Sequence, residues 1–300
     1  MQIDSVLPEL RAPMRKAQAD APLWLVRAAV RVMPVPHNRA VRVSMARAGR
    51  VRLRVYKPAR RGTGPGLLWI HGGGLLFGDA RQDERLCLST AERLGVVIVS
   101  ANYRLAPENP FPAAHDDVYT AWRWFLDHAA KLHVDPARIA IGGESAGGGL
   151  AAGLVQHVHD AGGVPPAAQW LFAPMLDDRT AVDRSLDAIE HFVWDNAKNR
   201  EGWAGYLGIQ PGADEVPPYA APGRRTQLEG LPRTFLTWAD IELFAGEDRA
   251  YADALSAAGV TVTTDVVAGG VHGFENWASD TPVAQGLIDR AQRWLRDALR

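Results

Sequence analysis

The pattern Gly143-Glu144-Ser145-Ala146-Gly147 constrains the fold most, because it sits where a predicted buried strand meets a predicted helix. The apolar, β-branched run 139–141 predicts the strand, and the small and apolar residues 149–155 predict the helix. A strand–turn–helix junction of this kind holds a serine in strained backbone geometry with its hydroxyl exposed. Glycine at the two flanking positions leaves room for the neighbouring strand and helix. A plain glycine-rich turn is the weaker interpretation, since it does not require that junction.

The strands and helices predicted on either side of this junction alternate along the chain. Strands are predicted at 66–70, 96–100, 168–173, 233–238 and 260–267, and helices at 83–94, 113–131, 247–258 and 282–299. Residues 41–43 and 51–56 alternate with period two and predict an antiparallel hairpin at a sheet edge. Such alternation predicts an α/β fold with a mostly parallel central sheet and helices on both faces. No internal repeat or interdomain linker is evident, so we expect a single domain over residues 1–300.

Two segments do not fit the alternation. Residues 1–38 are helical and amphipathic, and three interpretations stay open: a helix packed on the core, part of a lid over a pocket, or a membrane-surface anchor. Residues 177–218 contain two helical patterns and no strand, which indicates an insertion. Insertions at strand ends tend to shape binding sites.

Composition excludes several classes of protein. The 300 residues are 22% charged with a net charge of −1, so no strong field for nucleic acid or an anionic membrane is expected. The single cysteine, Cys87, excludes an internal disulfide or a cysteine metal cluster. The N-terminus carries charges and prolines before any apolar run, which is unlike a signal peptide, and no apolar stretch is long enough to span a bilayer. We therefore expect a cytoplasmic protein with no nucleic-acid partner and no stable membrane insertion.

Ser145 needs a base before it can attack a carbonyl group, and that base needs an orienting acid. Nine histidines are candidates, and five of them (His37, His128, His133, His157 and His159) lie in predicted surface or helical positions. His115 is predicted to precede a helix and to be a local hydrogen-bond partner. His272 differs, because it follows the predicted strand 260–267 in a glycine-containing turn. That position is at the carboxyl edge of the sheet, on the same side as Ser145, and His272 is the predicted base.

Two acids are candidates for orienting that base. When a serine at such a strand–turn–helix junction precedes its histidine in the chain, the acid is expected between the two, directly after a strand. Asp240 and Glu242 both follow the predicted strand 233–238. Either carboxylate can fix the tautomer of an imidazole and stabilise its cation. Spacing alone does not choose between them.

A second glycine-rich turn, His71-Gly72-Gly73-Gly74, follows the predicted strand 66–70. Glycines without side chains let backbone N–H groups approach a developing oxyanion. A plain glycine turn is again the weaker interpretation.

Together these motifs resemble the bacterial hormone-sensitive-lipase-like esterases of the α/β-hydrolase superfamily. The resemblance covers most of the chain from about residue 50. It rests on four motifs in the family's order, namely 71–74, 103–108 with 111–114, 143–147 and 272–274. It implies hydrolysis of carboxylic esters through an acyl-enzyme, with Ser145 as nucleophile and His272 as general base and then acid.

The resemblance also implies an oxyanion hole, a cap and the absence of cofactors. Gly73, Gly74 and Ala146 would supply the oxyanion N–H groups. Residues 1–38 and 177–218 would form a helical cap over the site. No metal or other cofactor is implied, and the expected partner is a small ester. Dimerisation through the last strand, 260–267, is a further possibility that the family suggests.

The acid motif departs from the family pattern. The family has Gly-Glu-x-Asp-x-x-Arg-Asp-Glu, and aligning Leu243-Phe244 and Glu247-Asp248 with it places Glu242 on the acid's position. Asp240 then falls on the preceding glutamate of the family. We therefore expect Glu242 to be the acid, with Asp240 as the alternative. The resemblance further makes Glu144 a local scaffold and predicts an ion pair between Arg104 and Glu108.

The expected activity is a serine carboxylesterase for short- to medium-chain acyl esters. An amidase or lactonase acting through the same site is one alternative. A non-catalytic small-molecule receptor on this fold is the other, although such receptors lose the histidine of the triad and His272 is present. The aromatic residues of the insertion, Phe192, Trp194, Trp203 and Tyr206, either line a substrate pocket or pack in the core.

Overall fold

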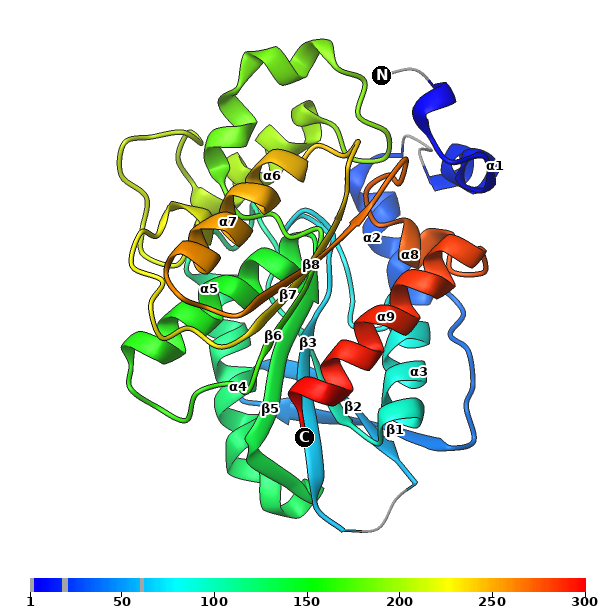
Figure 1. Ribbon diagram of the computed structural model, residues 1–300, viewed down its shortest axis with the longest axis vertical. Coiled ribbons are helices and arrows are strands. Elements are labelled where there is room, and N and C mark those ends of the chain that lie inside the picture. Colours follow the sequence, from blue (N-terminus) through cyan, green and yellow to red (C-terminus); the bar gives the residue numbers. More distant parts are fainter. Residues whose placement is uncertain (1–2, 18–20, 60–61) are drawn as a thin grey trace.

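An eight-stranded sheet in the order β1-β2-β4-β3-β5-β6-β7-β8 runs through the protein (Figure 1). The computed structural model describes residues 3–17, 21–59 and 62–300. The pairs β1–β2 and β2–β4 are antiparallel, and all other neighbouring pairs are parallel. The strands are β1 (Val41–Ala48), β2 (Val51–Pro58), β3 (Gly64–Ile70), β4 (Val97–Asn102), β5 (Val134–Glu144), β6 (Gln169–Phe172), β7 (Thr234–Ala239) and β8 (Val262–Val267).

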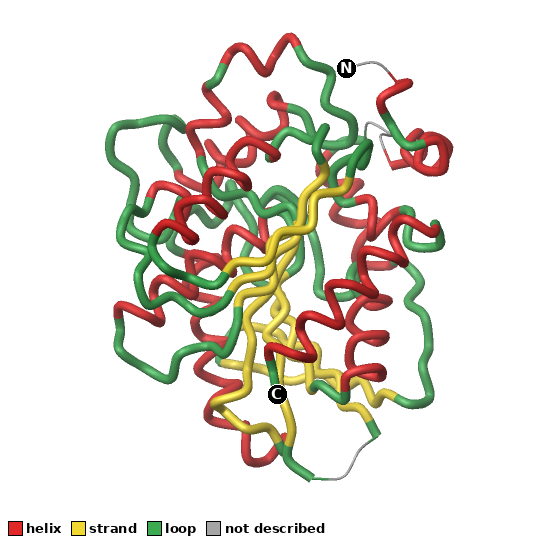
Figure 2. The backbone as a smooth tube through the Cα atoms, in the orientation of Figure 1, coloured by secondary structure: helices red, strands yellow, loops and turns green. Residues whose placement is uncertain are grey.

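Helices cover both faces of the sheet (Figure 2). Helices α3 and α9 pack on one face, and α4, α5 and α7 pack on the other. The described α-helices are α1 (Pro8–Ala17), α2 (Leu23–Val32), α3 (Glu84–Leu94), α4 (Ala113–Leu132), α5 (Ala146–Asp160), α6 (Asn196–Leu207), α7 (Ala245–Ala257), α8 (Phe274–Trp277) and α9 (Pro282–Ala298).

Strand β3 shows why a strand of a sheet covered on both faces has a continuous run of apolar residues in its sequence. Leu68 and Ile70 belong to the core cluster on the α4 and α5 side, whereas Leu67 and Trp69 belong to the cluster on the α3 and α9 side. Successive side chains point to opposite faces, and both faces are buried. The predicted α/β architecture is therefore confirmed.

Two elements differ from the sequence prediction. Strand β5 begins at Val134, five residues before the predicted strand, because a first stretch containing Pro136 pairs with Gly64 across a register shift. A proline in such a stretch argues against a strand from sequence alone. Helix α8 was not predicted, since its four residues form only one turn after the His272 loop.

The two segments outside the alternation lie over the ends of the parallel strands (Figure 1). Residues 1–2 and 18–20 of the first segment lie outside the described residues. Helix α1 buries Leu10 and Met14 in a cluster with Phe192 of the insertion and Val271 of the histidine loop. Helix α2 instead leaves Trp24 70% exposed. Helix α1 therefore packs on the insertion and the histidine loop, whereas α2 leaves a large apolar side chain on the surface.

The insertion contains one α-helix, α6, and two short 3₁₀ helices at Asp178–Val182 and Arg184–Ala188. An aspartate side chain caps the N-terminus of each of these three helices. Asp177 accepts a hydrogen bond from the N–H of Arg179, and Asp183 accepts one from Ser185. Asp195 caps α6 in the same way, accepting from the N–H of Lys198 at 2.9 Å.

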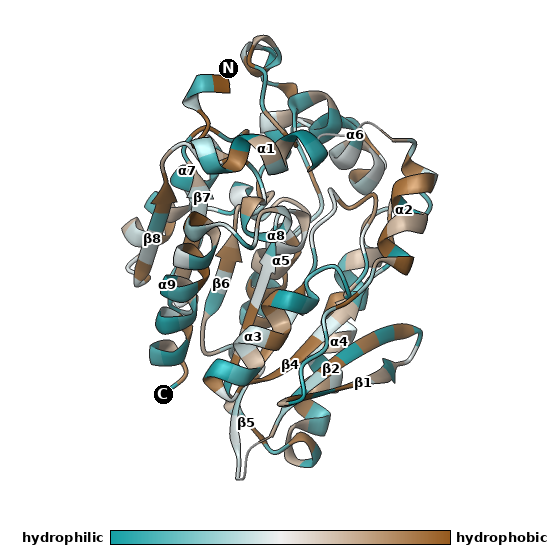
Figure 3. Cartoon of the chain, turned by 90° about the vertical axis from the view of Figure 1, so that its right-hand side faces the viewer, coloured by the Kyte–Doolittle hydropathy of each residue, from teal (hydrophilic) through white to brown (hydrophobic). Residues whose placement is uncertain are grey.

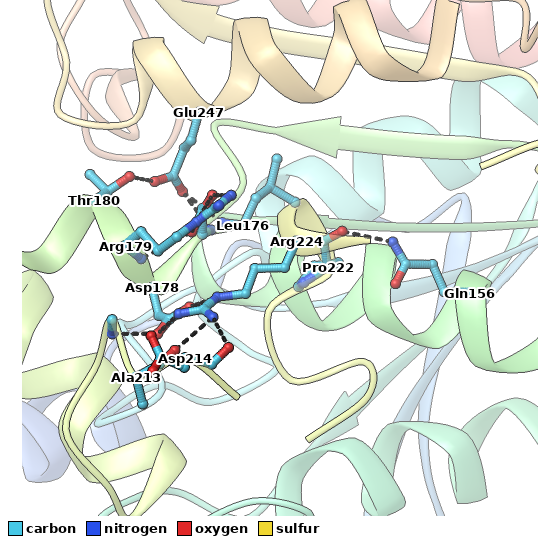
Figure 4. Close-up of polar contacts among 12 residues, drawn as sticks. Gln156, Leu176, Asp178, Arg179, Thr180, Ala213, Asp214, Pro222, Arg224 and Glu247 are labelled. Carbon is cyan, nitrogen blue, oxygen red and sulfur yellow. Dashed lines mark hydrogen bonds and ion pairs between the residues drawn. The ribbon is translucent and has the colours of Figure 1, made fainter. Parts of the chain in front are cut away.

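Buried charges connect the insertion to the rest of the fold (Figure 4). The guanidinium of Arg224 forms a two-pronged ion pair with Asp178, whose side chain is fully buried, at 2.7 and 2.9 Å. On the other side, Glu247 of α7 accepts from the N–H of Leu176 at 2.7 Å and from the hydroxyl of Thr180. The ion pair joins Asp178 to Arg224, which follows the insertion. Glu247 holds the start of the insertion against α7 through its hydrogen bonds, and burial raises the pKa of its carboxyl to about 8.

Within the described residues, no helix combines the length and the apolar character needed to cross a membrane.

Candidate active site

Ser145 occupies the sharp turn between β5 and α5. Its backbone has φ +54° and ψ −124°, a conformation that L-residues rarely adopt. The turn is held by the N–H of Ser145, which donates to the carbonyl of Phe172 at 2.8 Å, and by its carbonyl, which accepts from Gly149 and Met175. These bonds fix the strained residue in place, as a nucleophile elbow requires.

The flanking glycines are required by close backbone approach. A Cβ at Gly143 would lie 2.4 Å from the carbonyl oxygen of Gly147, and one at Gly147 would lie 2.1 Å from that of Ile70. Both distances are shorter than atoms can tolerate. The two glycines of the motif therefore let β3, β5 and α5 come together beneath Ser145.

The structure brings Ser145, His272 and Glu242 into one hydrogen-bonded row. The Oγ of Ser145 lies 2.8 Å from Nε2 of His272, and Nδ1 of His272 lies 2.5 Å from Oε2 of Glu242. All three side chains are buried, with residue exposures of 5% to 6%. With the carboxylate at Nδ1, the proton sits on that nitrogen, and Nε2 is free to accept from the serine.

Asp240, the alternative acid, points elsewhere. Its Oδ1 accepts a hydrogen bond from the N–H of Gly269 at 2.7 Å, on the outer side of the loop. The N–H of Asp240 itself donates to the carbonyl of Val267 at 3.2 Å. Asp240 therefore joins two loops at the ends of β7 and β8, and Glu242 alone of the two acids contacts His272.

The turn His71–Gly74 lies beside the elbow. Gly73 and Gly74 have φ values of +116° and +57°. A Cβ at Gly73 would lie 2.0 Å from the carbonyl oxygen of Phe77, and one at Gly74 would lie 2.1 Å from the indole of Trp194. Only glycine fits at these two positions. Among the described residues, no hydrogen bond uses the N–H groups of Gly73, Gly74 or Ala146.

His71 stabilises this turn from below. It is completely buried, and its ring stacks on Tyr103 with ring centroids 4.3 Å apart. Burial lowers the pKa of His71 to about 4, so the ring is neutral near pH 7 and donates from Nδ1 to the carbonyl of Gly72 at 2.8 Å. The hydroxyl of Tyr103 donates to the carbonyl of His71 at 3.0 Å. His71 is thus a structural part of the turn.

Trp194 closes the site from the insertion. Its ring centroid lies 6.5 Å from that of His272, and its edge lies over Gly74. Trp194 is held by a γ-turn over residues 192–194. In this turn the N–H of Trp194 donates to the carbonyl of Phe192 at 2.9 Å, and Val193 has φ +71°. A β-branched residue rarely adopts a positive φ. In the sequence, Trp194 is one of four equivalent aromatics of the insertion, because nothing in the chain marks this strained turn.

Among the described residues, no ring contact with His272 is found for the other three aromatics of the insertion. Phe192 packs with Val271 and helix α1, and Trp203 and Tyr206 are buried on α6 with ring centroids 6.1 Å apart. Trp194 is therefore the insertion residue that directly covers His272 and the glycine turn.

A group of buried acids lies behind the row. Asn276 of α8 donates to Glu144 and, at 3.0 Å, to Asp83, whose other oxygen accepts from Trp69 at 2.7 Å. Burial raises the pKa of Asp83 to about 6 and that of Glu144 well above its usual value. Glu144 is thus a scaffold for α8, and the sequence offered no signal for its partner Asn276.

The predicted ion pair between Arg104 and Glu108 is wrong. Arg104 does not pair with Glu108; it forms a two-pronged ion pair with Asp117 of α4 at 2.8 and 2.9 Å. Glu108 pairs instead with Arg27 of α2 at 2.7 Å. Asp117 is buried on α4 within reach of Arg104, whereas Glu108 is largely exposed and faces Arg27 of α2. These partners are distant in the chain.

His115 also differs from its prediction. It lies within the first turn of α4, and its Nε2 is 2.9 Å from Nδ1 of His157 on α5. It is therefore a partner between helices, and not a local one. No cluster of three or more histidine, cysteine or acidic side chains suited to a metal is found in the part of the chain that the structure describes.

The fold and this site define a hydrolase of the α/β type, and comparison with known proteins makes the family specific. Residues 67–276 match the family described as alpha/beta hydrolase fold. The chain therefore belongs to the α/β-hydrolase family.

Several of the relatives are named as esterases. The chain is 32% identical to esterase LipI of Mycobacterium tuberculosis over 258 residues, which is 84% of this chain and 79% of the relative. It is 35% identical to carboxylesterase NlhH of the same species over 254 residues, which is 82% and 78% of the two chains. Among solved structures, a bacterial heroin esterase superposes over the full length of both chains with a TM-score of 0.90 and 33% identity. These matches confirm the resemblance to bacterial esterases and support carboxylesterase activity.

Proposed function

We propose that this protein hydrolyses carboxylic esters with short to medium acyl chains through an acyl-enzyme on Ser145. The observation that carries the proposal is the row of hydrogen bonds from Ser145 through His272 to Glu242. Beside it lies a glycine turn in which the N–H groups of Gly73 and Gly74 make no hydrogen bond to any described residue. The esterase relatives support the same reaction.

In the proposed acylation step, Nε2 of His272 takes the proton of Ser145 as Oγ attacks the ester carbonyl carbon. The imidazolium that forms is stabilised by Glu242, which also fixes the ring's orientation. The tetrahedral intermediate collapses when His272 returns the proton to the departing alcohol oxygen, leaving the acyl group on Oγ. The same histidine then takes a proton from water as the water attacks the acyl-enzyme. The carboxylic acid product is released, and Ser145 recovers its hydroxyl proton from His272.

The negative charge of the tetrahedral oxygen needs donors that are already oriented. In our proposal the N–H groups of Gly73, Gly74 and Ala146 are these donors. The support is that Ala146 begins α5, where the helix dipole favours negative charge, and that glycine is the only residue that fits at the other two positions. Loss of one such donor typically costs about a hundred- to thousand-fold in rate.

The acyl-chain preference follows from Trp194. Its indole lies over Gly74 and beside His272, so it occupies space next to the reacting carbonyl. A bulky, buried side chain there favours short acyl groups and disfavours long ones. The helices of residues 1–38 and the insertion 177–218 together form the proposed cap.

A p-nitrophenyl ester series from acetate to palmitate tests the proposal, with Ser145→Ala as the control. Serine-dependent hydrolysis that peaks at short or medium chains is expected. A matched p-nitroanilide separates the esterase from an amidase, and a lactone substrate separates it from a lactonase. Folded protein that hydrolyses none of these substrates would contradict the proposal.

Two further expectations stay predictions. One is the cytoplasmic location. The other is a homodimer formed through β8, the strand at one edge of the sheet.

A further inference from the structure

An arginine-lined groove lies between α2 and the β1–β2 hairpin, on the half of the sheet away from β7 and β8. It consists of two adjoining cavities of about 470 and 460 Å³ that share Arg31, Arg52, Asp79 and Asn102. Seven arginines and three carboxylates line the two cavities together. This concentration of positive charge contrasts with the net charge of −1 for the whole chain.

Three of these arginines already have acidic partners. Arg27 pairs with Glu108, and Arg104 pairs with Asp117. Arg54 pairs with Glu84, which is 3% exposed and reaches the strand from α3. The positive charges of these three arginines are therefore balanced by ion pairs within the fold.

The remaining arginines have no acidic partner among the described residues. Arg31, Arg50 and Arg52 are exposed, and no hydrogen bond or ion pair of their side chains is found in that part of the chain. The side chain of Arg81 donates to the carbonyl of Arg31, and its buried Nε has no partner among the described residues. The backbone N–H of Arg81 donates to Oδ1 of Asp79 at 3.1 Å. Of the described carboxylates that line the groove, Asp79 alone is outside the ion pairs, so the positive charge is in excess.

The register of the hairpin adds a second observation. Arg52 of β2 lies directly opposite Arg47 of β1, and on its other side opposite Asn102 of β4. Like charges at opposite positions of an antiparallel pair destabilise a sheet. Arg52 lines both cavities, and its unfavourable position opposite Arg47 is explained if Arg52 serves to bind an anion.

Helix α2 forms the upper wall of the groove and also exposes apolar side chains. Trp24 is 70% exposed, Val32 is 78% exposed and Leu25 is 44% exposed, and Figure 3 shows the hydrophobic colouring of this helix. Arg31 lines the groove and also lines a neighbouring cavity together with Leu23 and Trp24. A ligand that carries both a phosphate and an apolar part would contact both features.

We propose that this groove binds phosphate groups through Arg31, Arg50 and Arg52. The planar guanidinium presents its donors in a fork that matches phosphate oxygens, and several arginines around one cavity suit a ligand with two phosphates. The phosphate comes either from a free phosphorylated molecule or from the headgroup of an anionic phospholipid. The site is separate from Ser145, and its occupation does not depend on the proposed esterase activity.

Calorimetric titration with inorganic pyrophosphate at low ionic strength tests the free-phosphate source. Saturable binding is expected, and Arg52→Glu and Arg31→Glu should each weaken it at least about tenfold. The matched control is Arg249→Glu, an exposed arginine on α7 that changes the net charge equally, and it should alter binding less than about twofold. Arg50→Glu, in the turn between the strands, provides a third groove variant that leaves α2 untouched.

Co-sedimentation with vesicles tests the lipid source. Vesicles of phosphatidylcholine with phosphatidylglycerol should retain the protein, and pure phosphatidylcholine should not, if headgroups are the ligand. If Arg52→Glu abolishes sedimentation with the anionic vesicles and Arg249→Glu preserves it, the groove binds the phosphate of a lipid headgroup. If the protein binds pyrophosphate but does not sediment with the vesicles, the groove binds the phosphate of a free molecule. The proposal is overturned if neither probe binds, or if Arg249→Glu weakens binding as much as Arg52→Glu. Thermal melting curves of all variants, matching that of the parent protein, establish that each one folds.

Discussion

Glu242 reaches Nδ1 of His272 with one carboxylate oxygen while its other oxygen accepts a hydrogen bond from the N–H of Ala239 at 2.7 Å. Both oxygens are therefore fixed, one by the imidazole and one by the end of β7. The ring of His272 is further held by Phe244, whose centroid is 5.2 Å away in an edge-to-face arrangement. Because glutamate is one methylene longer than aspartate, the carboxylate of Glu242 reaches both the imidazole of His272 and the N–H of Ala239 from its position in the loop after β7.

The first prediction separates the two acids of this loop. Glu242→Gln should lower kcat by about a thousand- to ten-thousand-fold, because an amide no longer stabilises the imidazolium and permits the wrong tautomer of His272. Asp240→Asn, a matched change two residues away, should lower kcat by no more than a few-fold, since the amide oxygen of the new side chain can still accept from Gly269. Steady-state kinetics on p-nitrophenyl acetate would measure both values. The opposite ranking would show that Asp240 is the acid.

The second prediction concerns the nucleophile and the base. Ser145→Ala and His272→Ala should each reduce kcat by several orders of magnitude, and the double variant should be little slower than either single one, because the two residues act as a unit. Single-turnover kinetics with a chromogenic ester would check this. A loss of less than about a hundredfold in either variant, in protein with an unchanged circular dichroism spectrum, would contradict the proposed roles.

Residues close in the chain, or tied to a strand end, were predictable from the sequence. The elbow strand, the glycine turns and the His272 loop each follow a strand, so their meeting at one edge of the sheet follows from the parallel topology. Partners from distant segments were not predictable. The ion pairs of Arg27 and Arg104 depend on how α2 and α4 pack, and no local pattern encodes them. Trp194 was uncertain for the same reason, since a strained turn decides where its ring lies.

The third prediction concerns acyl-chain length. Trp194→Ala should raise the ratio of kcat/KM for the hexanoate ester to that for the acetate ester by at least about tenfold, because removing the indole opens space over Gly74. Truncating a buried aromatic also destabilises a protein by about 3–5 kcal/mol, so Trp194→Phe is the milder companion variant. Trp24→Ala, at an exposed position, is the control and should leave the ratio unchanged. An unchanged ratio in folded Trp194→Ala would place the acyl pocket elsewhere.

The fourth prediction concerns the attachment of α2. Arg27 donates to the carbonyl of Leu76 at 2.7 Å and to that of Ala106 at 2.6 Å, in addition to its pair with Glu108. Arg27→Ala should lower the free energy of unfolding by about 1–3 kcal/mol, because it leaves two carbonyls without their charged donor. Glu108→Gln should cost less than about 1 kcal/mol, since that carboxylate is largely exposed. Urea denaturation would compare the two, and equal losses would assign the stability to the ion pair alone.

The fifth prediction concerns the dependence of stability on pH. Burial raises the pKa of Glu247 to about 8 in the folded protein, against 4.5 for the unfolded chain. Between these values the folded state binds a proton that the unfolded state has released. Stability therefore falls as pH rises through this window, with a limiting slope of about 1.4 kcal/mol per pH unit for this group. Below pH 4.5 the carboxyl is protonated in both states, and its contribution to stability is fully present.

Glu247→Gln should remove this group's share of the slope, because the amide oxygen still accepts from the N–H of Leu176 and the amide has no charge to bury. Denaturant unfolding at several pH values from about 5 to 8 would give the slope for both proteins. Glu201→Gln, an exposed position on α6, is the matched control and should leave the slope unchanged. The charge of Glu247 also contributes to raising the pKa of its buried neighbour Asp248, so the difference between the two slopes reports Glu247 together with its effect on Asp248. Identical slopes would mean that Glu247 ionises in the folded protein near its ordinary pKa, and that its contacts with Leu176 and Thr180 hold the insertion as a carboxylate.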